Sequence, residues 1–328
     1  MIGVVGLNYW GPNLARNFDA LGVLSWICDL DADKLSVAHA RHPAATATRS
    51  YEELLASDVR AVVIATAVPT HYPLAKQALE AGKHVFVEKP FTSSSQQADE
   101  LIELAARKNL KIMVDHTFLF SGAVRKIREL VDGGVLGPLY YFDSTRVNLG
   151  LFQHDVSVVW DLAPHDLSIM DYIITERPEA VVATGGQHLN GHADMAFITV
   201  YFPRNIIAHV NVNWLSPVKV RTTLIGGKDK MLVWNDLEAD EKIKVYDKGV
   251  DMSSQQGVYD LLVSYRSGDV WAPKVQQTEA LKVELDYFID CITHDRTPLN
   301  DGEAGLRVVR LLEAAQASLQ ERGKLVSL

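Results

Sequence analysis

The sequence has few cysteines, no long hydrophobic run and no signal-peptide pattern at its N-terminus. Cys28 and Cys291 are the only cysteines among its 328 residues, and each sits in an apolar context. One disulfide would be allowed, but two buried free thiols in a reducing compartment fit better. No apolar run approaches the roughly 18 residues that a membrane span needs. We therefore expect a cytoplasmic protein with no membrane association.

An excess of basic residues is also missing. Lysine and arginine number 32 against 41 aspartates and glutamates, and the formal net charge is -9. Such a surface repels the phosphate backbone, and no basic stripe offsets it, so we expect no nucleic-acid partner. A small anionic substrate is still allowed, because the local charge of a cleft decides its binding. We predict a small-molecule partner and no metal site.

Short apolar runs alternate with helical periods in the first third of the chain. Strands are predicted at 2–5, 23–29, 61–66, 83–88 and 111–115, and helices at 13–20, 32–40, 71–81 and 94–107. Strands joined by crossover helices form a parallel sheet with helices on both faces. This part of the chain is therefore predicted to be a doubly wound α/β domain.

The pattern changes after about residue 120. Strands with short turns between them are predicted at 138–147, 180–184, 195–202, 206–214, 219–225 and 231–234. Helices are predicted at 123–130, 164–174, 279–293 and 302–322. Consecutive strands joined by short turns form an antiparallel sheet. We expect two domains, 1–119 and 120–328, the second of α+β class with an open, mostly antiparallel sheet.

A glycine-rich turn follows the first strand and opens a helix. It reads Gly6-Leu7-Asn8-Tyr9-Trp10-Gly11, the shape of a dinucleotide fingerprint with Asn8 in place of the second glycine. The first glycine makes the tight turn, the third lets helix pack on strand, and a pyrophosphate sits at the helix N-terminus. Asn tolerates left-handed backbone better than most residues. The alternative is a glycine turn in some other α/β protein.

Asp29 ends the second predicted strand, at the distance from Gly6 where a ribose-binding carboxylate is expected. A carboxylate there accepts hydrogen bonds from the ribose hydroxyls and repels a 2'-phosphate. No arginine follows it closely in the sequence. We therefore predict NAD rather than NADP. The alternative role for Asp29 is to cap the next helix.

Glu88-Lys89-Pro90 ends a later strand of the same sheet. Ligands bind beyond the carboxyl ends of parallel strands, and Pro90 restricts the backbone of Lys89 to extended conformations. A fixed ammonium there would stabilise an alkoxide as hydride leaves. The alternative is a surface Glu-Lys pair.

The segment after the strand at 61–66 leaves the sheet at the same edge. Two interpretations stay open: Thr70 caps the next helix, or the segment contacts the pyrophosphate and the nicotinamide ribose. The second would make cofactor contacts of Thr66, Ala67, Pro69 and His71.

Asp161 and His165 are four residues apart, so on a helix they share a face. Asp161 could simply be the N-cap of a helix that carries Pro164 in its first turn. His165 would then feel the positive end of that helix, which favours the neutral imidazole that a general base needs.

With these motifs in this order and spacing, the chain resembles the Gfo/Idh/MocA oxidoreductase family over essentially its whole length. The resemblance implies an N-terminal Rossmann domain, a C-terminal α/β domain with an open sheet, and dimers or tetramers assembled through that sheet. It implies oxidation of sugar or cyclitol hydroxyls with Lys89 and His165 as the catalytic pair, and with Asp161 orienting one of them or binding substrate. The run at 160–169 looks like a subgroup found among nucleotide-sugar and glycan-biosynthesis dehydrogenases, although Ala163-Pro164 replaces the usual glycine.

We therefore predict an NAD-dependent dehydrogenase acting on a ring hydroxyl of a pyranose, nucleotide-linked or amino. The alternatives are a cyclitol or free-sugar dehydrogenase and, from another class, a non-catalytic dinucleotide sensor. Four further polar residues are candidate substrate contacts, although each could equally be a turn or surface residue: Arg146, Asn148, Asn211 and Asn213.

Overall fold

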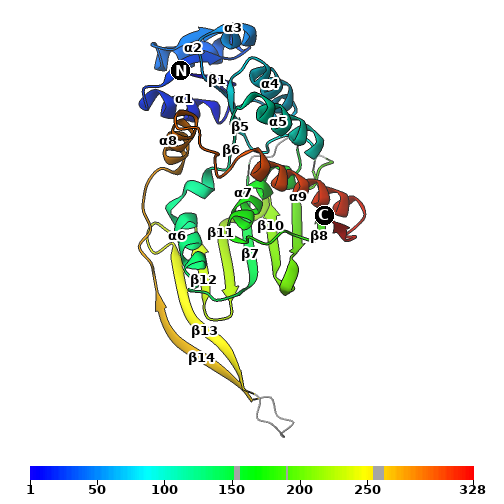
Figure 1. Cartoon of the computed structure of the whole chain (residues 1–328). Coiled ribbons are helices and arrows are strands. Elements are labelled where there is room, and N and C mark those ends of the chain that lie inside the picture. Colours follow the sequence, from blue (N-terminus) through cyan, green and yellow to red (C-terminus); the bar gives the residue numbers. More distant parts are fainter. Residues whose placement is uncertain (151–155, 190, 254–261) are drawn as a thin grey trace. The chain divides into compact units, whose positions relative to one another are not determined.

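The computed structural model describes residues 1–150, 156–189, 191–253 and 262–328 (Figure 1). They form two compact units. The first joins Met1–Phe120 to Thr278–Glu313, and the second joins Ser121–Gln277 to Ala314–Leu328. The sequence placed everything after residue 119 in the second domain, whereas Thr278–Glu313 packs with the first unit.

The first unit contains a six-stranded sheet in the order β3-β2-β1-β4-β5-β6, with every pairing parallel. This order is that of the doubly wound dinucleotide-binding fold. The strands β1, β4 and β6 are fully buried because helices cover both faces, whereas β2 and β3 at one side of the sheet are partly exposed. Their bounds are Ile2–Val5 (β1), Leu24–Cys28 (β2), Thr46–Thr48 (β3), Ala61–Ile64 (β4), His84–Glu88 (β5) and Ile112–Asp115 (β6).

Five helices connect these strands: Gly11–Ala20 (α1), Ala32–Arg41 (α2), Tyr51–Ala56 (α3), Val68–Glu80 (α4) and Ser95–Lys108 (α5). The predicted parallel sheet with crossover helices is confirmed. The short elements β3 and α3 were not predicted, because three and six residues are too few to show a period.

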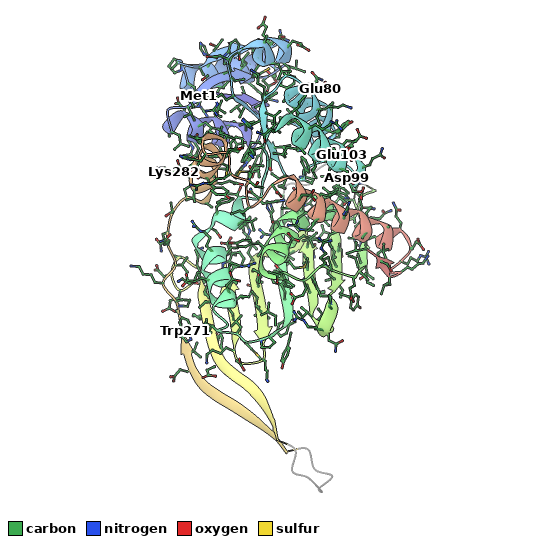
Figure 2. All side chains as sticks on the ribbon, viewed as in Figure 1. Met1, Glu80, Asp99, Glu103, Trp271 and Lys282 are labelled. Carbon is green, nitrogen blue, oxygen red and sulfur yellow. The ribbon has the colours of Figure 1, made fainter. Side chains whose placement is uncertain are left out.

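The helix α8 (Ala280–Thr293) packs in the first unit against α1 and the short helix η1 (Thr117–Phe120). Its spacing is amphipathic: Leu281, Leu285 and Phe288 are buried, whereas Lys282 is exposed (Figure 2). The ring of Phe288 lies 5.4 Å from that of Phe86 in β5. The contact ties this late segment to β5 of the parallel sheet.

The second unit contains a nine-stranded sheet in the order β14-β13-β12-β11-β7-β10-β9-β8-β15. Only β7 and β10 pair in parallel, and the other pairings are antiparallel. The predicted open, mostly antiparallel sheet is confirmed. The bounds are Leu139–Leu149 (β7), Ala180–Gly186 (β8), Met195–Tyr201 (β9), Ile207–Asn213 (β10), Leu215–Gly227 (β11), Met231–Asn235 (β12), Ile243–Ser253 (β13), Leu262–Trp271 (β14) and Val326–Ser327 (β15).

The helices α6 (Gly122–Asp132) and α7 (Val158–Ile173) lie over one face of this sheet (Figure 1). A short helix, η2 (Pro203–Asn205), joins β9 to β10. The last helix, α9 (Gly302–Gln320), contributes its residues up to Glu313 to the first unit and those from Ala314 to the second.

Candidate functional site

The strand order of the parallel sheet reverses between β1 and β4, which is where such sheets bind ligands. The helices that follow these two strands are unusual. The N-caps of α1 and α4 are Trp10 and Ala67, which make no side-chain capping bond, and neither first turn carries an acidic residue. By contrast, α2, α3 and α5 are capped by Asp31, Ser50 and Ser94. Two uncapped helix N-termini at one edge form a binding place for a pyrophosphate.

The glycine-rich turn fits this role. Gly6 has φ +89°, and a Cβ added there would lie 2.7 Å from the Ala65 carbonyl oxygen. A Cβ added at Gly11 would lie 1.9 Å from the oxygen of Gly6, so both glycines are required by the close approach of turn, helix and β4. Asn8 and Tyr9 are exposed, so the departure at Asn8 leaves the turn open to a ligand.

Asp29 lies beside the turn, as predicted. Its Oδ2 accepts a hydrogen bond from the Leu7 amide at 2.6 Å, and its Oδ1 accepts one from the Asp31 amide at 2.9 Å. Asp31, not Asp29, caps α2. Leu30, next to Asp29, is 78% exposed.

An arginine that is distant from Asp29 in the sequence lies beside this segment. The Nε of Arg49, after β3, donates a hydrogen bond to the Leu30 carbonyl at 3.0 Å. Because β3 was not predicted, this approach of the chain to Leu30 was not expected.

The helix after β4 begins at Val68, three residues before the predicted start at 71. Since α4 starts at Val68, Thr70 lies inside the helix and is not its cap, and its hydroxyl donates to the Ala67 carbonyl at 2.7 Å. Ala67 and Pro69 are exposed at the helix start, and the Thr66 side chain lies against Gly6.

His71 was predicted to contact the cofactor, but its ring is buried between two carbonyl groups. Its Nδ1 lies 2.9 Å from the Pro90 oxygen and its Nε2 lies 3.1 Å from the Thr66 oxygen. Burial lowers the pKa of His71. The side chain therefore links the loops that follow β4 and β5 to each other.

Lys89 directly follows β5, at the edge where β5 and β6 end with Glu88 paired to Asp115. The carboxylate of Glu88 accepts a hydrogen bond from the Lys89 amide. The ammonium of Lys89 acts on its buried surroundings: it helps to lower the pKa of His71 and of His116. Lys89 thus brings positive charge to the carboxyl edge of the sheet.

Asp161 and His165 share one helix, but their places on it differ from the prediction. The helix α7 starts at Val158 with Ser157 at the N-cap, so Asp161 lies in the first turn and His165 lies further in, past Pro164. The idea that the helix terminus favours a neutral His165 is wrong, because that influence fades beyond the first turn. Asp161 instead accepts a hydrogen bond from the buried Trp214 indole at 3.2 Å.

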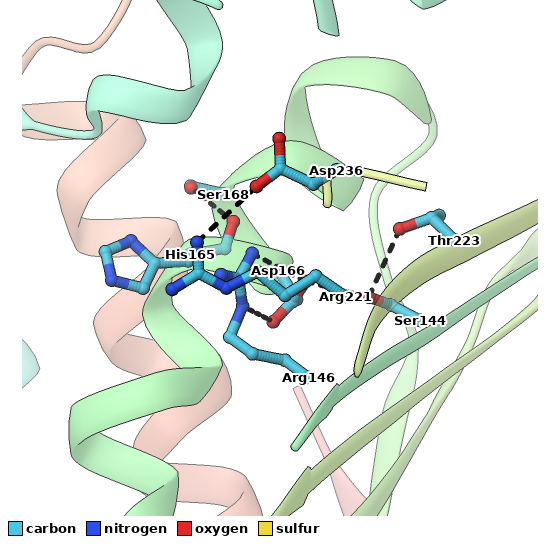
Figure 3. A network of polar contacts seen from close by, with 8 residues as sticks. All are labelled: Ser144, Arg146, His165, Asp166, Ser168, Arg221, Thr223 and Asp236. Carbon is cyan, nitrogen blue, oxygen red and sulfur yellow. Dashed lines mark hydrogen bonds and ion pairs between the residues drawn. The ribbon is translucent and has the colours of Figure 1, made fainter. Parts of the chain in front are cut away.

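Arg146 lies under α7 in a buried ion pair (Figure 3). Its Nε and Nη2 are 2.6 and 3.2 Å from the two carboxylate oxygens of Asp166, the neighbour of His165. The Ser144 hydroxyl donates to the same carboxylate at 2.7 Å. Figure 3 shows the imidazole of His165 pointing away from this network. Arg146, predicted as a substrate contact, thus anchors the helix turn that carries His165.

The other candidate contacts divide between the two faces of the sheet. Val210 and Val212 of β10 pair with Ser144 and Arg146, so they share the face that α7 covers. Asn211 and Asn213 therefore lie on the opposite face, away from His165. By the same alternation along β7, Asn148 lies on the face of Arg146. Asn148 thus remains a candidate substrate contact, whereas Asn211 and Asn213 lie on the face of the sheet opposite to α7.

Within the described residues, no cluster of three or more His, Cys, Asp or Glu side chains could hold a metal ion. Both cysteines are buried and free. Among the described helices, none is long and apolar enough to cross a membrane.

Known proteins match nearly the full length of this chain. Residues 1–116 match the description "Oxidoreductase family, NAD-binding Rossmann fold" of Gfo/Idh/MocA proteins. Residues 128–328 match its C-terminal alpha/beta domain. Among curated proteins, the UDP-N-acetylglucosamine 3-dehydrogenase of Acidithiobacillus ferrooxidans is 27% identical over 94% of this chain and 93% of its own.

The myo-inositol 2-dehydrogenase of Thermotoga maritima is 24% identical over 98% of this chain and 96% of its own. Among solved structures, the UDP-N-acetylglucosamine 3-dehydrogenase of A. ferrooxidans superposes with a TM-score of 0.82 at 25% identity, covering 98% of this chain and 97% of that one.

The uncapped helix pair, the glycine turn and the acid after β2 fit NAD, and both family domains match. The chain belongs to the Gfo/Idh/MocA family of NAD-binding oxidoreductases.

Proposed function

We propose that this protein moves a hydride between NAD and a ring hydroxyl or ketone of a pyranose, with nucleotide-linked or amino sugars as its substrate class. The observation that carries the proposal is the near full-length similarity to a UDP-N-acetylglucosamine 3-dehydrogenase. Two residues support it further: Lys89 at the carboxyl edge of the NAD-binding sheet, and the half-buried His165 on α7. In this proposal residues 1–119 bind the cofactor and 120–328 carry the substrate contacts.

In this mechanism each chemical group has one task. Bound NAD supplies the hydride acceptor. His165 takes the proton of the reacting hydroxyl, directly or through one water, and the Lys89 ammonium stabilises the oxygen as negative charge develops on it. The Arg146–Asp166 pair holds the turn that carries His165, and Trp214 orients Asp161. Asn148 is the candidate hydrogen-bonding partner of the sugar.

The cofactor contacts in this proposal lie along the carboxyl edge of the parallel sheet. Asp29 binds the ribose hydroxyls, and the start of α1 receives the pyrophosphate. The remaining contacts come from exposed or half-buried positions in the turns after β1, β4 and β5, namely Asn8, Tyr9, Thr66, Ala67, Pro69 and Glu88.

We further propose a cytoplasmic homodimer or homotetramer that assembles through the sheet face opposite α6 and α7. Side chains on that face include exposed apolar ones: Phe197 at 37%, Tyr201 at 38% and Ile207 at 40%. Exposed apolar patches of this kind mark interfaces. Asn211 and Asn213 lie on the same face and would belong to the interface.

A substrate panel tests the proposed function. UDP-linked amino sugars, other nucleotide sugars, free sugars and inositols are each incubated with NAD, and reduced nicotinamide is followed by absorbance. We expect turnover of a nucleotide-linked sugar, lost in His165→Asn. Preferential turnover of an inositol, in line with the second relative, would replace the substrate class. NAD binding with no turnover of any polyol or ketone would overturn the proposal.

A further inference from the structure

The glycine-rich turn is tied to a buried acid at the far side of the sheet. Trp10, the last residue before α1, donates its indole Nε1 hydrogen to Oδ2 of Asp115 at 2.8 Å. Asp115 ends β6 and is 2% exposed, and the Thr117 hydroxyl donates to its other oxygen. The position of Trp10 therefore depends on the state of this carboxyl group.

A second acid lies against the first. Asn300 joins α8 to β6, because its amide donates to the carbonyl of Val114, the neighbour of Asp115, at 2.6 Å. Glu284 of α8 is fully buried, and its carboxyl group interacts electrostatically with that of Asp115. Its Oε1 accepts a hydrogen bond from the Asn300 amide at 3.0 Å. Its Oε2 is buried and receives no hydrogen bond from a donor in the described part of the chain. A proton on one of the two acids removes the repulsion between two buried negative charges and lets that acid donate a hydrogen bond to the other.

The surrounding charges indicate which acid carries that proton. Glu284 is influenced by Asp115 and Glu88, both acidic, whose charges raise its pKa, and the Thr117 hydroxyl acts in the opposite direction. Asp115 receives bonds from Trp10 and Thr117 and feels the positive charge of Lys89. Burial and the charge of Asp115 raise the pKa of Glu284 well above its usual range. A proton on Oε2 of Glu284 would also give that atom its missing partner.

We propose that Asp115 and Glu284 share one proton, carried by Glu284, and that this pair is a positioning device that holds Trp10 and the glycine-rich turn ready for NAD. The protonated pair presents an acceptor to Trp10 without placing two negative charges in one buried site. When the proton is lost at alkaline pH, the two carboxylates repel and the anchor of Trp10 is disturbed.

The variant Glu284→Gln tests whether the hydrogen bond to Asp115 depends on a titrating proton. The amide of a glutamine donates to Asp115 at any pH, so the anchor no longer depends on a proton. Asp286→Asn is the matched control, because it removes a carboxylate from the exposed side of the same helix. NAD affinity is measured by calorimetry from neutral to alkaline pH, which needs no substrate.

We expect the NAD dissociation constant of the unmodified protein and of Asp286→Asn to rise by about tenfold at alkaline pH, the loss of roughly one charged hydrogen bond. The constant of Glu284→Gln stays flat. Infrared spectra at neutral pH give a protonated carboxyl band in the unmodified protein that Glu284→Gln lacks. Absence of that band in the unmodified protein overturns the proposal even if the variant fails to fold.

Trp10→Phe tests the connection between the acid pair and the turn. It keeps the aromatic ring but cannot donate to Asp115. We expect NAD binding about tenfold weaker at neutral pH and no further alkaline loss, while the infrared band is retained. An alkaline loss of affinity that persists unchanged in Trp10→Phe would refute the role of the pair in positioning the turn.

Discussion

Arg49 and Leu30 are joined by a 3.0 Å hydrogen bond from guanidinium to carbonyl, which places a positive charge next to the residue that follows Asp29. Asp29 disfavours a 2'-phosphate, whereas an arginine at this edge favours one. The two residues therefore act in opposite directions on the choice between NAD and NADP.

We expect Asp29→Asn to raise the ratio of kcat/KM for NADP over NAD by about tenfold or more, since one repulsive charge is removed. In the double variant Asp29→Asn with Arg49→Ala, most of this gain disappears. Steady-state kinetics with both cofactors measure the ratios. If Arg49→Ala leaves the gain intact, Arg49 has no part in the selection.

Lys89→Met tests the stabilising ammonium. Removing one such group from a developing oxyanion typically costs a factor of about 10² to 10³ in kcat. We expect this loss with a NAD dissociation constant that changes little, because the effect arises in the transition state. Lys108→Met, at the exposed end of α5, is the control. Equal losses in kcat and in NAD affinity would instead make Lys89 a cofactor-binding residue.

Arg146→Met leaves Asp166 as a buried charge that has lost its guanidinium. Breaking such a pair costs about 3 to 5 kcal/mol, whereas Lys324→Met, which removes an exposed partner of Glu321, costs at most about 1 kcal/mol. Urea unfolding measures both. The double variant Arg146→Met with Asp166→Leu should recover much of the loss. Failure of this recovery would place the stabilising partner of Arg146 elsewhere.

His116 gives a prediction about acid. It follows β6 and is 1% exposed, and neither ring nitrogen has a hydrogen-bonding partner among the residues that the structure describes. Burial, with the charges of Lys89 and Arg307, lowers its pKa to about 3 from 6.5. Below pH 6.5 the unfolded chain therefore binds a proton that the folded chain does not, and the free energy of unfolding falls as the pH drops towards 3.

Replacing this residue by phenylalanine should reduce that acid dependence. The comparison is His116→Phe against His39→Phe, which changes an exposed histidine of α2. Chemical unfolding between pH 4 and 7 gives the two slopes. Identical slopes would mean that His116 does not titrate across this range.

The sequence predicted the first unit well because buried parallel strands are continuous apolar runs, and β1, β2, β4, β5 and β6 all carry one. It also placed Asp29 beside the turn from chain distance alone. The start of α7 was misjudged because Pro164 looked like a first-turn residue, although the helix accommodates it after Val158. The uncapped starts of α1 and α4 were not predicted, because both helices were expected to begin two or three residues later and Thr70 was a candidate cap.

Other features depend on contacts that no local pattern reveals. Whether Asn211 faces α7 depends on the pairing of Val210 with Ser144, far away in the chain. The strands β13 and β14 were not predicted, since their sequence has no clear alternation of apolar and polar residues. The bond between Trp10 and Asp115 spans 105 residues, and Glu284 comes from a helix that the sequence assigned to the other domain.

The return of Thr278–Glu313 to the first unit has a consequence for chimeras between relatives. A donor gene cut at residue 120 would supply the parallel sheet without Phe288, Glu284 and Asn300. The recipient's residues at these three positions would then have to pack against the donor's sheet. Exchanging cofactor preference between family members therefore requires two crossover points, so that both stretches of the first unit are inherited together.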